Sequence, residues 1–133
     1  MQLIDVYYHG DRCQLLYWLL AERNGETNIS HRVMPSWDEH IRFVAGHPYE
    51  AWYLIVDRNL IVGACYLTKQ SEIGVQIFKA NQGKGHGKAA VNALMSLFGP
   101  RRYLANINPA NERSAKMFQG LGFKLIQHTY ANA

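Results

Sequence analysis

The residues best suited to chemistry lie together in one glycine-rich stretch, Gln82-Gly83-Lys84-Gly85-His86-Gly87-Lys88. The stretch follows an apolar, β-branched run at residues 72–78 and precedes good helix formers at residues 89–98, which gives the order strand, turn, helix. Glycines let backbone N–H groups approach a ligand, and the start of a helix adds unpaired donors and a positive dipole end. Two lysines within the stretch and Lys79 before it add positive charge. The stretch therefore predicts an anion site, and a pyrophosphate is the ligand that we expect.

The spacing of the glycines argues against two common phosphate-binding motifs. A dinucleotide fingerprint, G-x-G-x-x-G, would start at Gly83 and would need a glycine where Lys88 stands, with an acidic residue about 20 positions further on. Residues 103–107 contain no acid. A P-loop, G-x-x-x-x-G-K-[ST], would need a glycine at Gln82 and a hydroxyl at Ala89. A turn that only links strand to helix is the simpler interpretation, but glycines so closely spaced are costly in chain entropy.

The pattern that fits is Gln-x-x-Gly-x-Gly from Gln82 to Gly87, after Val75-x-Ile77 on the preceding strand. It resembles the acyl-CoA-binding motif of the GNAT superfamily of N-acetyltransferases. The stretch at residues 108–123 resembles the later motif of the same superfamily. That motif has an asparagine, a small residue, an aromatic residue and Gly-Phe, matched here by Asn111, Ser114, Phe118, Gly122 and Phe123. Two motifs in the right order are far more specific than either alone.

The resemblance implies an α+β fold in a single domain, residues 1–133, with a mixed β-sheet of about six strands and helices on both faces. Acetyl-CoA, the implied co-substrate, would insert where the fourth and fifth strands splay apart, and no metal is implied. The implied activity is transfer of an acetyl group to a primary amine of a small molecule or a protein. The residues implied to bind acetyl-CoA are Ile77, Phe78, Lys79, Gln82, Gly83, Lys84, Gly85, His86, Gly87, Lys88, Asn111 and Ser114.

Two residues are candidates for catalysis. Glu72 begins the fourth expected strand, where the superfamily often has a carboxylate that works as a base through water, although a solvated strand-end acid is an equal alternative. His40 follows Trp37 in a pattern that resembles the acceptor-lining helix of amino-sugar and ribosomal-protein acetyltransferases, although a lone helical histidine more often has no such role. The usual proton donor to the leaving thiolate is a tyrosine in the last helix, and this chain has Phe118 there. Phenylalanine has no proton to give, so water, Ser114 or another tyrosine must serve.

Two other functions stay open beside acetyl transfer. A GNAT-like module that binds acyl-CoA with little or no turnover would also explain a phenylalanine at position 118. Modification of a nucleic-acid base amine is favoured only by the net charge of +4. Nucleic-acid binding is unlikely, because proteins that bind it usually show a dense basic stripe and the 14 Lys and Arg residues here are scattered.

The composition favours one cytoplasmic domain. The chain has 133 residues, of which 48% are hydrophobic, so it can bury a core without the help of disulfide bonds or a structural metal. Cys13 and Cys65 lie in apolar runs without a C-x-x-C neighbour, which predicts buried thiols in a reducing compartment and no metal site. No apolar run reaches membrane-spanning length, and no signal-peptide pattern opens the chain.

Periodicity and turn residues place the other elements. The expected strands are residues 3–8, 52–56, 60–67, 72–78, 103–107 and 123–130, of which the second and third form a hairpin. The expected helices are residues 12–23, stopped by Asn24-Gly25, then 36–46, 89–98 and a last one that ends at Gly122. Ser36 and Glu39 have the spacing of a capping box at the start of the second helix.

The last expected strand raises the question of a partner. Only one strand's length follows Phe123, so no hairpin can return from it and the strand would lie at or near a sheet edge. Superfamily members commonly add a seventh strand over the acceptor side, so we expect an open acceptor site or one that a partner chain completes. An unprotected edge is a pairing template, and two-fold pairs are common, which together predict a homodimer.

Overall fold

The computed structural model describes residues 1–23 and 33–132, and the expected helix stop at residues 24 and 25 lies outside them. Its centre is an antiparallel sheet of four strands in the order β1-β2-β3-β4. The strands are β1 (Gln2–Asp5), β2 (Ala51–Asp57), β3 (Leu60–Leu67) and β4 (Ile73–Ile77). β2 and β3 form the predicted hairpin, and the two residues between them, Arg58 and Asn59, have positive φ angles of 52° and 66°. Positive φ at both turn residues gives a twist that suits the flanking strands.

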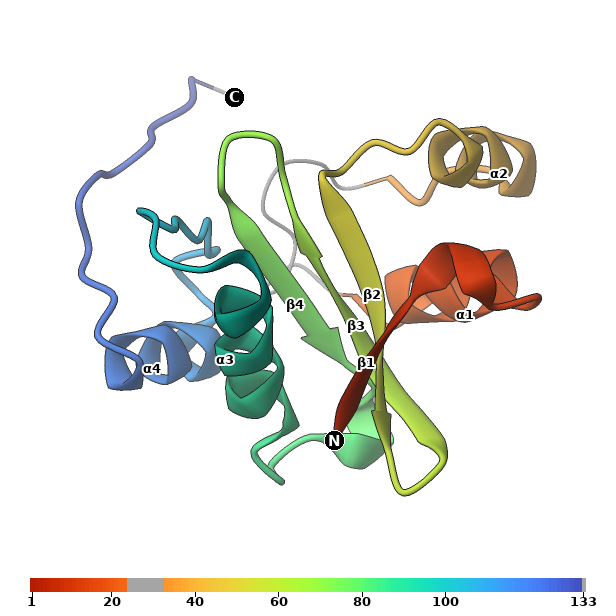
Figure 1. Ribbon diagram of the computed structural model, residues 1–133. Helices are drawn as coiled ribbons and strands as arrows, with labels where there is room; N and C mark the ends of the chain where they lie inside the picture. Colours follow the sequence, from red (N-terminus) through yellow and green to blue (C-terminus); the bar gives the residue numbers. More distant parts are fainter. Residues whose placement is uncertain (24–32, 133) are drawn as a thin grey trace.

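Helices cover both faces of the sheet, as the sequence predicts (Figure 1). α1 (Arg12–Ala21) and α2 (Trp37–Ala45) lie on one face, and α3 (His86–Phe98) and α4 (Glu112–Gly120) lie on the other. Two short 3-10 helices, η1 (Val6–Tyr8) and η2 (Lys79–Asn81), follow β1 and β4.

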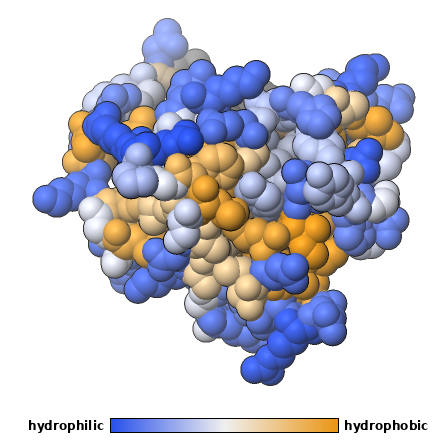
Figure 2. Space-filling model, viewed as in Figure 1, coloured by the Kyte–Doolittle hydropathy of each residue, from blue (hydrophilic) through white to orange (hydrophobic). Residues whose placement is uncertain are grey.

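The strands divide their side chains between two cores. Because successive side chains of a strand point to opposite faces, Leu54 and Ala64 pack with α1 and α2, whereas Ile55 and Cys65 pack on the α3 side. Cys65 is completely buried, and burial raises the pKa of its thiol to about 12, which suits an inert core residue. Polar residues dominate the rim of the face shown in Figure 2, and apolar residues gather in its middle.

The capping box predicted for the second helix is present. The Ser36 hydroxyl accepts a hydrogen bond from the Glu39 amide at 3.1 Å, and the Glu39 carboxylate accepts one from the Ser36 amide at 2.9 Å. These two bonds satisfy amides at the start of the helix that have no partner within it, so α2 begins at Trp37.

The expectation of about six strands is wrong for the described residues, because the fifth and sixth do not form. Residues 103–107 meet β4 at one parallel bridge, between Glu72 and Leu104, where Ile73 donates to Leu104 at 2.7 Å. Residues 123–130 belong to no strand. An alternating apolar pattern makes a strand only where a neighbouring ladder is in reach, and neither segment runs along one.

The first strand is also shorter than expected. The strand was expected to run to Tyr8, but it ends at Asp5. The Asp5 carboxylate accepts a hydrogen bond from the Tyr7 amide at 2.9 Å, and this local bond opens the 3-10 turn.

Candidate functional site

A cavity of about 790 Å³ lies beside β4 and reaches from α1 and α2 to the start of α4. One wall is β4 from Ile73 to Ile77, and the opposite wall is the chain around Asn106 to Ser114. Beyond the bridge at Leu104, no backbone hydrogen bond joins this wall to β4 in the described residues. The two segments therefore part at this point, and the outer edge of β4 is left without a ladder partner.

The glycine loop lies at the end of β4 and runs into α3. Gly83 and Gly85 have φ angles of 79° and 83°, a left-handed conformation that glycine adopts without a penalty. A Cβ at either residue would meet no atom within 4 Å, so the loop surface is open to a ligand. Gly85 is the N-cap of α3, which begins at His86 rather than at Ala89 as expected, and this brings the helix start into the loop. The arrangement has the features of an anion site.

Half of the residues expected to bind acetyl-CoA line the cavity, namely Ile77, Lys79, Gln82, Gly87, Asn111 and Ser114. The others lie on the loop or beside it without lining the cavity, namely Phe78, Gly83, Lys84, Gly85, His86 and Lys88. Asn111 is the N-cap of α4, and its side-chain oxygen accepts a hydrogen bond from the Ser114 amide at 3.2 Å. That oxygen therefore holds the helix start, and the two residues reach the cavity as a unit.

Arg113 is a residue that the sequence reasoning missed. It projects from the first turn of α4 and donates a hydrogen bond to the side chain of Gln82, and it lines the cavity. Gln82 in turn donates to the Ile77 carbonyl at 3.0 Å. These contacts join α4, the glycine loop and the end of β4. Its position two residues after Asn111, in a first helical turn, is a signal that could have identified it.

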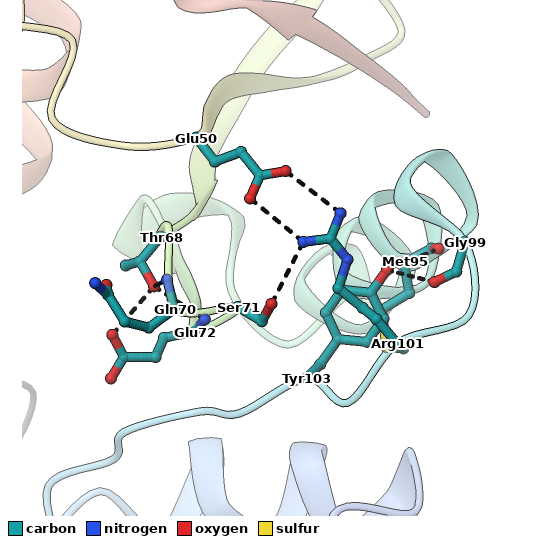
Figure 3. Close-up of polar contacts among 9 residues, drawn as sticks. All are labelled: Glu50, Thr68, Gln70, Ser71, Glu72, Met95, Gly99, Arg101 and Tyr103. Atoms are coloured by element: carbon teal, nitrogen blue, oxygen red, sulfur yellow. Dashed lines mark hydrogen bonds and ion pairs between the residues drawn. The ribbon is translucent and has the colours of Figure 1, made fainter.

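Glu72 lies at the edge of the cavity rather than in its lining. One carboxylate oxygen accepts a hydrogen bond from the Thr68 hydroxyl at 3.1 Å, and the other accepts one from the Asn106 amide. Figure 3 shows Glu72 with Thr68 at the β3–β4 connection, next to Arg101, which binds Glu50 and Ser71. Of these contacts, only Asn106 extends from Glu72 to the cavity wall. The carboxylate is thus held in place beside Asn106, which lines the cavity.

His40 is only 2% exposed and lies on α2, where it lines the other end of the cavity. Its Nε2 donates to the Cys13 carbonyl at 2.8 Å, so a neutral ring carries its lone pair on Nδ1. Nδ1 is the one fully buried side-chain polar atom of the described residues that has no hydrogen-bond partner. Burial lowers the pKa of His40, which favours the neutral ring.

Aromatic side chains dominate this end of the cavity. Tyr49 is stacked on Tyr66 with ring centroids 4.1 Å apart, and it meets Trp52 edge to face at 4.8 Å. The end of α1 is fixed to the start of η2, because Glu22 accepts a hydrogen bond from the Lys79 amide at 2.7 Å. The structure therefore brings His40 to the aromatic end, whereas Glu72 lies outside the lining, next to the start of β4.

A sequence model described as "Acetyltransferase (GNAT) domain" matches residues 21–124, which is most of the chain. No curated protein sequence matches the chain at a significant level.

Solved structures share the fold at low identity. A domain from Methanocaldococcus jannaschii superposes with a TM-score of 0.81 at 22% identity, covering 98% of this chain and 92% of that one. A GNAT superfamily phosphinothricin acetyltransferase from Sinorhizobium meliloti, in complex with acetyl-CoA, gives 0.69 at 23% identity, covering 95% and 76%. A spermidine N-acetyltransferase chimera from Vibrio cholerae gives 0.74 at 14% identity, covering 96% and 84%.

No helix in the part of the chain that the structure describes combines the length and the apolar character needed to cross a bilayer. Among the same residues, no group of three or more His, Cys, Asp and Glu side chains could hold a metal ion.

Proposed function

The chain belongs to the GNAT acetyltransferase family, and on that premise we propose that it transfers the acetyl group of acetyl-CoA to a primary amine of a small molecule or a protein. The observation that carries this proposal is the parting of β4 from residues 105–110 directly upstream of the glycine loop. An extended chain with amide groups can pair with the free edge of β4, while a pyrophosphate binds the loop and the start of α3. Acetyl-CoA has both parts in that order.

The residues that would hold the co-substrate follow from this fit. Ile77, the last residue of β4, offers its backbone amide at the unpaired edge of the strand. The loop from Gln82 to Lys88 offers backbone N–H groups and positive charge. Arg113 adds a fixed cation on the opposite wall. Bound acetyl-CoA would supply a thioester carbonyl to the amine. The residues of the chain would orient that carbonyl, exclude water and move protons.

The amine must be neutral to attack, and the chain offers two groups for this. Glu72 is the proposed base, acting through water or past Asn106. His40 offers its unpartnered Nδ1 as a hydrogen-bond acceptor at the aromatic end, where it would orient the acceptor. His40 lines the cavity and Glu72 reaches it through its hydrogen bond to Asn106, so both would act on a single bound amine.

Binding of acyl-CoA without turnover is the second candidate function, and Phe118 favours it. The side chain is 4% exposed and meets Phe123 edge to face at 5.0 Å, so it is a core residue that also lines the cavity. It can support the fold but cannot donate a proton. A module that has kept the cofactor groove and lost turnover would look like this.

One experiment separates the two functions. Acetyl-CoA is titrated into the protein by calorimetry, and release of free thiol is then followed with amino sugars, polyamines, aminoglycosides and peptides with free N-termini. Binding with amine-dependent thiol release is the expected result. Binding without release from any amine would favour the module, and absence of binding would contradict both.

A further inference from the structure

Tyr66 lies across β4 at a position where β4 has no side chain. It is on β3, and its partner in the ladder is Gly74. A Cβ built on Gly74 would collide with the ring and the hydroxyl oxygen of Tyr66. The phenol therefore occupies the space that any other residue at position 74 would fill, which brings its hydroxyl to the backbone of β4.

The ring is held in this position by its stacking on Tyr49, with an interplanar angle of 10°. Both rings line the cavity, but the two residues come from different places. Tyr66 belongs to the strand next to β4, whereas Tyr49 precedes β2. Tyr66 is the ring that lies against Gly74 of β4. The stacking limits the motion of the Tyr66 ring but uses no hydrogen bond of its hydroxyl.

The Tyr66 hydroxyl is available to a ligand. No hydrogen bond to it is formed by any group in residues 1–23 and 33–132. It is also not a fully enclosed atom without a partner, since His40 Nδ1 is the one such side-chain atom in the same residues. A half-buried phenol in the lining of a cavity, without a hydrogen-bond partner among the described residues, is placed to donate to whatever binds there.

The surroundings keep this phenol protonated. Burial raises the pKa of Tyr66 above its ordinary value of 10.0, Arg23 opposes the increase, and the Glu72 carboxylate adds to it. At neutral pH the hydroxyl therefore has a proton to donate.

We propose that Tyr66 donates the proton to the sulphur that leaves when the acetyl group is transferred, in place of a donor on α4. This rests on the proposed acetyl transfer. The amine nitrogen forms the C–N bond, the C–S bond breaks, and the sulphur takes the electron pair and then the phenolic proton. The proton that the amine loses returns to the phenolate through water. The products are the amide and free CoA thiol, and no further reactant is needed.

Two tyrosine variants test the proposal. Tyr66→Phe removes the hydroxyl and keeps the ring, and Tyr8→Phe makes the same change in a ring that is 87% exposed and does not line the cavity. With an amine that the wild type acetylates, we expect kcat of Tyr66→Phe to fall about 10²-fold at an unchanged dissociation constant for acetyl-CoA. Tyr8→Phe should keep kcat within about twofold of the wild type, as expected of a phenol that takes no part in the proton transfer.

A second readout does not depend on turnover. Tyrosines labelled with ¹³C at Cζ are observed by NMR, and Tyr66 is assigned as the resonance that Tyr66→Phe removes. Addition of free CoA should shift the Tyr66 resonance, and addition of a CoA analogue that lacks the sulphur should shift it less. The comparison tests contact between hydroxyl and sulphur even in a protein without measurable turnover.

Three results would overturn the proposal: wild-type kcat in Tyr66→Phe, an unchanged Tyr66 resonance with CoA, or a raised KM for the amine at unchanged kcat. The last would make Tyr66 a binding residue for the acceptor. A wild type that releases no thiol with any amine would count against the proposed acetyl transfer, and the NMR comparison would then decide on Tyr66 by itself.

Discussion

One guanidinium nitrogen of Arg113 donates a hydrogen bond to Oε1 of Gln82, across the mouth of the cavity between α4 and the glycine loop. The amide of Gln82 donates at the same time to the Ile77 carbonyl, at the end of β4. A cation held at this place by an amide can exchange that partner for a phosphate oxygen, which is a stronger acceptor. The loop and α4 are therefore linked through a group that a pyrophosphate would also bind.

We predict that Arg113→Ala weakens acetyl-CoA binding by about tenfold or more, since a hydrogen bond to a charged group contributes about 1.5–3 kcal/mol. Calorimetry measures the dissociation constant directly. Lys116→Ala is the control, because Lys116 is exposed on the same helix and does not line the cavity. Equal affinities of Arg113→Ala and the wild type would exclude a phosphate contact at this residue.

Gly87 is the glycine of the loop at which a side chain would enter the cavity. A Cβ there would lie 3.0 Å from Met117 Sδ and 3.9 Å from Ile77 Cγ1, both close to the free edge of β4. Met117 is flexible and can move aside, so the fold should tolerate Gly87→Val. We expect this variant to bind acetyl-CoA at least about tenfold more weakly, by loss of the space for the ligand. Gly10→Val is the control, since a Cβ on Gly10 meets nothing within 4 Å; unchanged binding by Gly87→Val would contradict the assignment of the loop.

Glu72→Gln tests the proposed base while keeping the shape of the side chain. The amide can still accept a hydrogen bond from Thr68, so the β3–β4 connection should remain in place. We expect turnover at neutral pH to fall by about 10²–10⁴-fold with acetyl-CoA affinity retained. Asp38→Asn, an exposed acid in the first turn of α2, is the control. A Glu72→Gln variant with the wild-type rate at every pH would remove Glu72 from the mechanism.

His40 should make the folding stability depend on pH. Burial lowers the pKa of His40 in the folded protein, so below about pH 6.5, the ordinary pKa of histidine, the unfolded chain binds the proton more readily. The contribution of His40 to the free energy of unfolding is therefore complete above about pH 6.5 and decreases as the pH falls toward the folded-state pKa. Urea unfolding at about pH 7.5 and 5.5 measures this decrease.

The comparison of variants assigns the effect to His40. In His40→Gln the decrease between the two pH values should be smaller than in the wild type, even if the variant is less stable at both. His128→Gln replaces an exposed histidine and should leave the decrease unchanged. If His40→Gln loses as much stability as the wild type on acidification, another group is responsible.

Features that depend on neighbouring residues were predictable from the sequence. The capping box of α2 needs only Ser36 and Glu39, and the β2–β3 hairpin needs only a turn that tolerates positive φ at Arg58 and Asn59. The glycine loop is local in the same sense, since strand, turn and helix adjoin in the chain.

Features that depend on distant partners were not predictable. Residues 103–107 have the pattern of a strand, but Leu104 forms only one bridge and the chain then leaves β4. The contact of Tyr66 with Gly74 also needs the register of β3 on β4, which no local pattern specifies. Composition and periodicity say which residues can form a ladder, and tertiary packing decides which of them do.

Residues 123–130 include three exposed apolar or aromatic side chains, those of Leu125, Ile126 and Tyr130. Leu125 is 72% exposed, Ile126 64% and Tyr130 89%, and no strand forms there. The outer edge of β4 beyond Ile73 is equally without a ladder. Exposed apolar side chains and an unpaired strand edge both favour association. In a two-fold dimer the same surface of each copy contacts the other, so both copies cover these groups at once.

We therefore predict that the protein forms a homodimer in which residues 123–130 of each copy are covered by the other. Light scattering over a concentration series should give the mass of two chains in the micromolar range. The double substitution Leu125→Ser and Ile126→Ser should shift the mass to one chain, since it removes the apolar surface that association would bury. Leu97→Ser is the control, because Leu97 is 61% exposed on α3, away from this segment, and should leave the dimer intact. A wild type with the mass of one chain throughout the series would refute the dimer, and a double variant that remains dimeric would place its interface elsewhere.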